Sequence, residues 1–93
     1  MSANMWYLYI IRCKNRALYT GITTDPQRRF REHQHGGARY TGYNPATRLL
    51  YVEKCRNRSA ALKREAQIKR LSRPQKLALI RGTLSVGKQR LTG

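Results

Sequence analysis

Acidic residues are scarce in this sequence. Its 93 residues include 20 Lys and Arg but only 4 Asp and Glu, which gives a formal net charge of +16. The four carboxylates are scattered along the chain: Asp25, Glu32, Glu53 and Glu65. A catalytic site with two metal ions gathers several carboxylates, so we expect no such site here. One carboxylate could still hold Mg²⁺, with water and a substrate phosphate completing its shell.

Long apolar runs and cysteines are also few. No stretch is long and apolar enough to span a bilayer, and residues 1–5 lack the features of a signal peptide. Cys13 and Cys55 are too far apart for the spacing of a zinc site or a redox motif. Each falls at the end of an expected strand, so we expect two buried free thiols in a reducing compartment. These features predict a cytoplasmic protein without a membrane partner.

The excess of positive charge is the strongest global feature. A surface so one-sided is expected to meet a polyanion, and nucleic acid is favoured over an anionic membrane surface. A chain of this length supports one small domain with a thin core. We expect a single domain over residues 1–81, a basic flexible tail over 82–93, and a monomer.

The chain reads as an α+β fold with a small three-stranded antiparallel sheet and three helices. Residues 6–11 are apolar and aromatic and predict a strand with both faces covered, and residues 17–22 return antiparallel to it. A third strand is expected over 48–55. Its register stays open, because either Leu50 and Val52 or Leu49 and Tyr51 could face inward. The first strand alternates, with one face formed by Tyr7, Tyr9 and Ile11 and the other by Trp6, Leu8 and Ile10.

Helix starts have clear signals. Asp25 suits an N-cap position before Pro26, and a second helix over 58–71 is expected to be capped by Asn57 or Ser59. Ser72 and Gln75 have the spacing of a capping box, which predicts a third helix from about residue 73 to 80 that ends at Gly82.

Polar chemistry is concentrated in residues 18–33. Gly21 suggests a place where the backbone passes close to another group. On the helix that starts at Pro26, Phe30 is expected to anchor the buried face, and Arg29 and His33 lie together on the shoulder of that face. This arrangement predicts a site beside the strand that carries Tyr19. The alternative is a solvated basic helix whose histidine only caps or packs.

Glu65 falls in the middle of the apolar stripe of the second helix. With Ala61 at zero on a helical wheel, Ile68 lies near ~340° and Glu65 near ~40°. A carboxylate there is costly unless it is paired or bound to a metal. The alternative to a metal is an ion pair with Lys69, four residues further on.

Three features occur in a fixed order along the chain. A hairpin carries Tyr7-Leu8-Tyr9 and Tyr19-Thr20-Gly21, the next helix carries Arg29, and a later helix carries the single Glu65. Together they resemble the GIY-YIG nuclease superfamily, in particular its small stand-alone bacterial members, the YhbQ-like proteins. The likeness covers roughly residues 6–80.

The resemblance implies hydrolysis of a phosphodiester at a single-metal site with Mg²⁺ or Mn²⁺, leaving a 5′-phosphate and a 3′-hydroxyl. It implies that Glu65 holds the metal and that Arg29 binds the scissile phosphate. Tyr19, helped by Tyr9 or His33, would activate water. His33 stays open as the base, because its ordinary pKa is closer to neutral than that of a tyrosine. The candidate nucleic-acid contacts are Tyr7, Arg28, Arg39, Tyr40, Tyr43, Lys69 and Lys76.

The function expected from these features is a DNA endonuclease or nickase. A Gly-rich segment with Arg39, Tyr40 and Tyr43 suits stacking on open bases, which favours single-stranded or branched DNA. The first alternative is a non-catalytic nucleic-acid-binding protein on the same fold, and the second is a small basic protein that docks on ribosomal RNA. The charge supports all three, whereas Glu65 is needed only by a metal-dependent nuclease. No small-molecule cofactor besides the metal is expected.

Overall fold

The computed structural model describes residues 5–35 and 45–82, which form one three-stranded sheet and three helices. In chain order the elements are β1 (Trp6–Cys13), β2 (Leu18–Thr23), α1 (Pro26–Gln34), β3 (Ala46–Cys55), α2 (Arg58–Lys69) and α3 (Arg73–Arg81). All pairings are antiparallel, and the strand order is β2-β1-β3. The predicted α+β class and the β1–β2 hairpin are therefore confirmed. The predicted tail lies outside the described residues, apart from Gly82.

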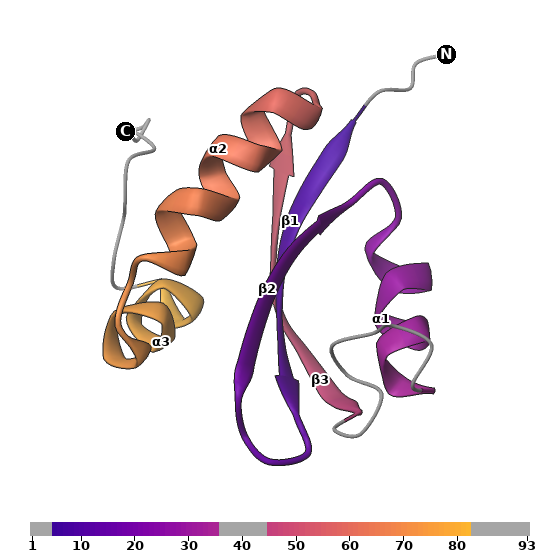
Figure 1. Cartoon of the computed structure of the whole chain (residues 1–93), viewed down its shortest axis with the longest axis vertical. Coiled ribbons are helices and arrows are strands. Elements are labelled where there is room, and N and C mark those ends of the chain that lie inside the picture. Colours follow the sequence, from indigo (N-terminus) through magenta and orange to yellow (C-terminus); the bar gives the residue numbers. More distant parts are fainter. Residues whose placement is uncertain (1–4, 36–44, 83–93) are drawn as a thin grey trace.

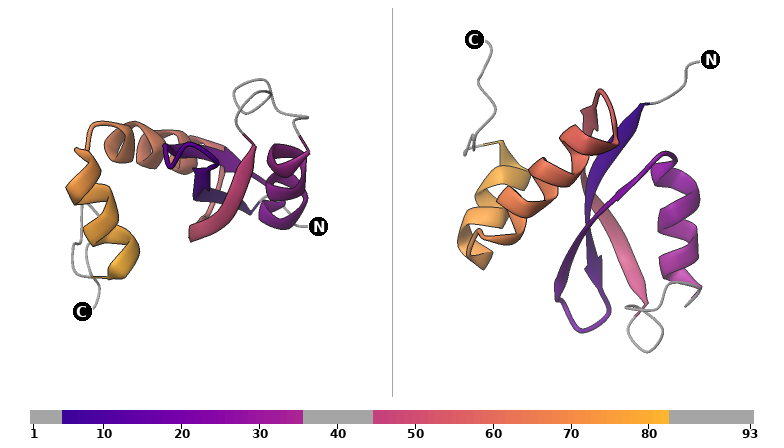
Figure 2. Two further views of the ribbon diagram at one scale, coloured as in Figure 1. Left: turned by 90° about the horizontal axis from the view of Figure 1, so that it is seen from below. Right: turned by 45° about the horizontal axis from the view of Figure 1, so that its top comes forward.

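The sheet separates α1 from α2 and α3 (Figure 1 and Figure 2). The central strand β1 supplies both sides, as its alternation predicted. Leu8 and Ile10 belong to a buried cluster with residues of α2 and α3, whereas Tyr9 and Ile11 belong to a second cluster that Phe30 of α1 packs against. The sheet is therefore covered on both faces, and β1 connects the two clusters.

An irregularity in β3 resolves the register that the sequence left open. Ile10 pairs with Tyr51 but Ile11 pairs with Leu49, so Leu50 is an extra residue between the two pairs. Such a bulge lets neighbouring odd-numbered side chains point to opposite faces of the sheet. Tyr51 accordingly packs against the cluster below α2, and Leu49 packs against the cluster next to α1. Both alternatives for β3 assumed a single inward face and were wrong in that respect.

The predicted helix caps are present. The Asp25 carboxylate accepts from the Arg28 amide at 3.1 Å, and the Asn57 side chain, rather than that of Ser59, accepts from Ala60 at 2.8 Å. Ser72 and Gln75 form the reciprocal capping box. Gly82 ends α3 with a φ of 82°, a left-handed conformation that suits glycine.

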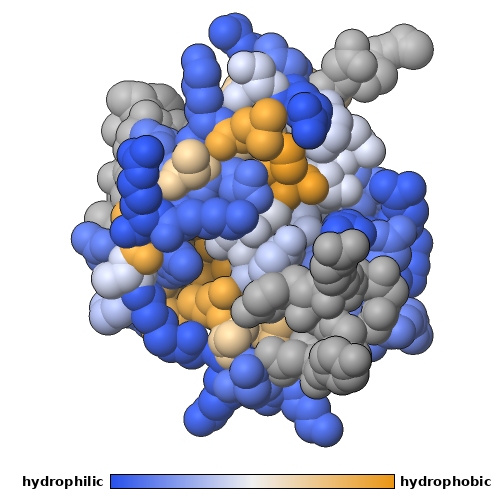
Figure 3. All heavy atoms as spheres, in the orientation of Figure 1, coloured by the Kyte–Doolittle hydropathy of each residue, from blue (hydrophilic) through white to orange (hydrophobic). Residues whose placement is uncertain are grey.

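Hydrophilic side chains cover most of the face drawn in Figure 3, with smaller apolar areas between them. Within the described residues no helix is long and apolar enough to cross a membrane. Cys13 and Cys55 are buried free thiols, as predicted. The predicted base-stacking residues Arg39, Tyr40 and Tyr43 lie outside the described residues.

Candidate active site

Tyr9 is the residue around which the candidate residues Tyr19 and His33 lie. Tyr9 lies on the α1 side of β1 and is 2% exposed. Its oxygen lies 3.0 Å from Nε2 of His33, and its ring centroid lies 6.2 Å from that of Tyr19. The His33 ring completes the group, at 5.7 Å from the Tyr9 ring and 5.0 Å from the Tyr19 ring. Three predicted site residues from two strands and one helix therefore form one aromatic cluster.

Gly21 makes room for this cluster. It pairs with Tyr9 across the β1–β2 ladder, and a Cβ atom at position 21 would lie 2.5 Å from the Tyr9 oxygen and 2.7 Å from Cζ. Both distances are shorter than van der Waals contact, so any side chain there would displace the tyrosine ring. The close approach predicted at Gly21 is therefore the approach of the Tyr9 ring.

His33 is buried more deeply than its predicted place on the shoulder of α1. It has no exposed surface, whereas Phe30, the expected anchor of the helix, is only partly buried. The hydrogen bond with Tyr9 explains this difference, because a buried imidazole needs a polar partner. The buried face of α1 is thus centred on His33.

Burial determines the protonation of the Tyr9–His33 pair. It raises the pKa of Tyr9 to about 12, against the opposing effect of a hydrogen bond from Arg29. It lowers the pKa of His33 to about 4, and the positive charge of Arg29 acts in the same direction. Both side chains are therefore neutral at pH 7.

Arg29 lies at the edge of this cluster. One guanidinium nitrogen, Nη1, donates to Oε1 of Glu32 at 2.7 Å, and the side chain keeps 34% of its surface exposed. Its hydrogen bond with Tyr9 raises the pKa of the guanidinium further, after the larger effect of Glu32. Arg29 therefore contacts the cluster and solvent at once, which is the placement that a phosphate-binding arginine needs.

Glu65 lies on α2 and acts on Tyr9 through its charge. It lies on the helix between Ala61 and Ile68, both of which have no exposed surface, and its own side chain is 19% exposed. Its negative charge contributes to the raised pKa of Tyr9, so the carboxylate acts electrostatically on the cluster. Oε2 of Glu65 also lies 3.1 Å from Nζ of Lys69, which is the ion pair that the sequence offered as an alternative.

The carboxylates fit a single-ligand metal site and not a preformed metal cage. Across residues 5–35 and 45–82, no three His, Cys, Asp or Glu side chains come together as a metal site. The Glu65 carboxylate is paired with Lys69, which is about half exposed and could give way to Mg²⁺ or Mn²⁺. Glu65 is therefore the residue that would hold a divalent ion.

Comparison with known protein families gives a match over most of the chain. Residues 5–78 match the model of the GIY-YIG catalytic domain. The chain belongs to the GIY-YIG family. Among similar GIY-YIG relatives, a UPF0213 protein of Desulfotalea psychrophila is 46% identical over 80 residues, or 84% of this chain and 73% of that protein. A UPF0213 protein of Pseudomonas aeruginosa is 47% identical over 78 residues, or 83% of this chain and 75% of that protein.

A solved structure shares the fold. The solution NMR structure of a UPF0213 protein from Bacillus halodurans superposes with a TM-score of 0.54, at 39% identity and with 83% of both chains covered. GIY-YIG domains are nuclease domains, generally dependent on divalent metals, so a nuclease class and a nucleic-acid substrate follow for this chain.

The other candidate contacts are more scattered. Arg28 on α1 and Lys69 on α2 are about half exposed, and Tyr7 lies two residues before Tyr9 on β1. Lys76 lies on α3, on the other side of the sheet from α1 (Figure 1), so the structure does not bring it to the cluster.

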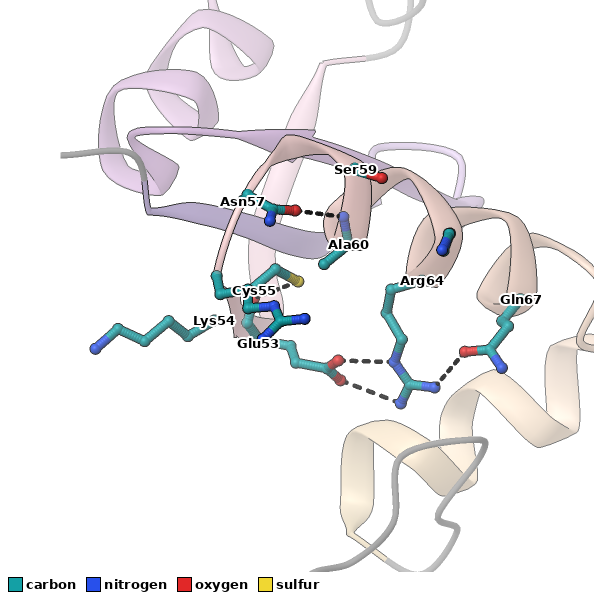
Figure 4. Close-up of a pocket in the computed structure, with 10 residues that line it drawn as sticks. Glu53, Lys54, Cys55, Asn57, Ser59, Ala60, Arg64 and Gln67 are labelled. Atoms are coloured by element: carbon teal, nitrogen blue, oxygen red, sulfur yellow. Dashed lines mark hydrogen bonds and ion pairs between the residues drawn. The ribbon is translucent and has the colours of Figure 1, made fainter. Parts of the chain in front are cut away.

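One prominent group was missed by the sequence analysis. Arg64 of α2 is buried and forms an ion pair with Glu53 of β3 at 2.7 Å, beside a pocket of about 640 Å³ (Figure 4). The sequence held a weak signal for it. Acids are rare in this chain, and one of the four lies two residues from Tyr51 on an expected strand, where the two side chains share a face.

Proposed function

We propose that this protein is a divalent-metal-dependent DNA endonuclease that nicks one strand per encounter and prefers single-stranded or branched DNA. The observation that supports the proposal is that four polar side chains, His33, Arg29, Tyr19 and Glu65, act on Tyr9. Those four side chains come from α1, β2 and α2, and each acts on Tyr9 by contact or by charge. A protein that only binds nucleic acid has no need of a carboxylate among its cations.

Arg29 is the residue proposed to bind the scissile phosphate. Its charge would stabilise the additional negative charge that develops on the phosphate oxygens in the transition state. In the free protein Glu32 holds the same guanidinium through Nη1, which fixes its direction beside Tyr9. The remaining donors of a guanidinium can still meet an anion.

Tyr19 is the proposed base, and the geometry suggests why. His33 has no exposed surface and a pKa of about 4, so it is neutral at pH 7 and does not contact solvent. Tyr9 is nearly as buried, with a pKa of about 12. Tyr19 is only partly buried on the same face and, in its deprotonated form, would take the proton from water. The neutral Tyr9–His33 pair would orient its neighbours.

Glu65 would hold Mg²⁺ or Mn²⁺. A metal held there would supply positive charge to neutralise the leaving oxygen. The protein side chains then position the phosphate and take up the proton, and the products carry a 5′-phosphate and a 3′-hydroxyl.

A cleavage assay tests the proposal. Labelled single-stranded, duplex and branched DNA are incubated with the wild type, Glu65→Gln and Glu65→Ala, in Mg²⁺, Mn²⁺ or EDTA. We expect cleavage that needs the metal and is lost in both variants, while DNA binding is retained or tightened because a negative charge has been removed. Cleavage that survives in Glu65→Ala would refute the metal role.

The alternative is a nucleic-acid-binding protein that keeps the fold without catalysis. The Glu65–Lys69 ion pair favours it, because the pair gives the carboxylate a partner without any metal. Salt-dependent DNA binding without cleavage by the wild type, on all three substrates and in both metals, would favour this alternative.

A further inference from the structure

The best-connected polar group in the described part of the chain lies on the opposite side of the sheet from Tyr9. Arg64 donates from Nε to Oε2 of Glu53 at 2.7 Å and from Nη2 to Oε1 at 3.2 Å. Nη1 donates to Gln67 at 2.9 Å, and the Tyr51 hydroxyl donates to Oε1 of Glu53 at 2.6 Å. Figure 4 shows the Glu53 carboxylate and the Arg64 guanidinium meeting edge to edge between β3 and α2.

The Arg64–Glu53 ion pair is buried, and removing its two charges from water costs free energy. The side chains of Arg64 and Glu53 are only 8% and 10% exposed. The desolvation free energy of the two charges offsets most of their attraction, so a buried ion pair is weak evidence that the fold is stabilised. A two-point bond does fix direction, however, because the planar guanidinium meets the carboxylate in one orientation.

Arg64 and Glu65 flank the buried line of α2. With Ala61 at zero on the helical wheel, Arg64 lies near ~300° and Glu65 near ~40°. One side of the buried face is therefore bonded to β3 through Arg64, while the other side carries the Glu65 carboxylate. The apolar residues buried along α2 between them are Ala61 and Ile68, and Ala61 has no side chain beyond Cβ to resist a rotation of the helix.

We propose that Arg64 is a positioning residue, which through its two-point bond with Glu53 fixes the rotation of α2 and thereby the place of the Glu65 carboxylate. A carboxylate about 6 Å from the helix axis moves by about 1 Å for each ~10° of rotation. A displacement of ~1 Å can cost about a hundredfold in rate. The inference rests on the proposed metal role of Glu65.

Matched variants separate this role from general effects of charge. Arg64→Met keeps most of the side-chain volume and removes one positive charge. Lys63→Met removes the same charge from the neighbouring, exposed position of α2. Arg64→Lys keeps the charge and loses the two-point bond, and it remains informative where Arg64→Met does not fold.

The readout is Mn²⁺ titration of the whole chain, followed by paramagnetic broadening of backbone amide signals around Glu65. We expect the wild type and Lys63→Met to reach half-broadening at the same Mn²⁺ concentration. Arg64→Met should need at least fivefold more, and Arg64→Lys an intermediate amount. In the cleavage assay kcat should fall at least tenfold in Arg64→Met, while KM stays within twofold of that of Lys63→Met.

The outcomes are distinguishable. Equal broadening in all four proteins would overturn the positioning role and leave the metal role of Glu65 standing. Absence of broadening around Glu65 in the wild type would overturn the metal role, and the positioning role with it.

Discussion

Replacing Gly21 by alanine tests whether Tyr9 is held as tightly as the structure indicates. The added Cβ would lie 2.5 Å from the Tyr9 oxygen, and ordinary contact requires about 3.5 Å, so the hydroxyl must move by about 1 Å. A hydrogen bond of 3.0 Å between Tyr9 and His33 does not survive that movement.

The expected loss of stability follows from two costs. Overpacking in a buried site costs about 1–3 kcal/mol, and leaving a buried polar group without its partner costs about 1–3 kcal/mol. The lower chain entropy of unfolded alanine offsets about 0.4–1 kcal/mol. We therefore expect the free energy of unfolding to fall by about 1–6 kcal/mol, and Tm to fall by roughly 4–8 °C for each kcal/mol in a chain of this size.

Urea denaturation of Gly21→Ala, Tyr9→Phe and the double variant measures the effect as a thermodynamic cycle. Tyr9→Phe removes the oxygen that lies nearest to the new Cβ. Gly21→Ala should therefore cost at least 0.5 kcal/mol less in that background than in the wild type, a difference that a cycle can resolve. Additive effects, or a cost of Gly21→Ala below about 0.5 kcal/mol, would refute the close packing.

Three further predictions concern charge. Arg29→Ala should lower kcat by about 10²–10³-fold, as expected for a transition-state donor, whereas Arg31→Ala should only weaken DNA binding; equal effects on kcat would make Arg29 an ordinary phosphate contact. Folding lowers the pKa of His33 from 6.5 to about 4, so the free energy of unfolding should be highest above pH 6.5 and should decrease as the pH falls from 6.5 to 4. Urea titrations at several pH values measure this dependence, and His33→Gln should remove it. Lys69→Met should lower the Mg²⁺ concentration for half-maximal cleavage about 2–5-fold, because it removes the half-exposed cation paired with Glu65. An unchanged Mg²⁺ concentration would show that the lysine does not compete with the metal.

Much of the fold could be predicted from short-range signals in the sequence. The caps at Asp25 and Ser72 were predictable because each involves residues within one helical turn. The burial of both faces of β1 was predictable because the side chains on each face are apolar or aromatic. The bulge at Leu50 was not, because it depends on how β3 fits two clusters on opposite faces of the sheet.

The candidate site was also predictable only in part. The spacing of Tyr9, Tyr19, Arg29 and Glu65 could be read as a family pattern. In the structure the Tyr19 ring lies 6.2 Å from the Tyr9 ring, and the charges of Arg29 and Glu65 act on Tyr9. The depth of His33 could not be read, because it depends on the hydrogen bond with a tyrosine 24 residues away. The pairing of Arg64 with Glu53 also joins two elements, and a helical wheel contains no information about the neighbouring strand.

The location of Tyr9 in the central strand has a consequence for how the protein loses activity when it is heated. Its neighbours Leu8 and Ile10 have no exposed surface, and β1 is hydrogen-bonded to strands on both sides. Amides in such a strand exchange with solvent only when the whole molecule opens, whereas many binding sites lie in segments that open first. Activity should therefore persist up to the cooperative unfolding transition and disappear with it, without an earlier inactive, partly open state.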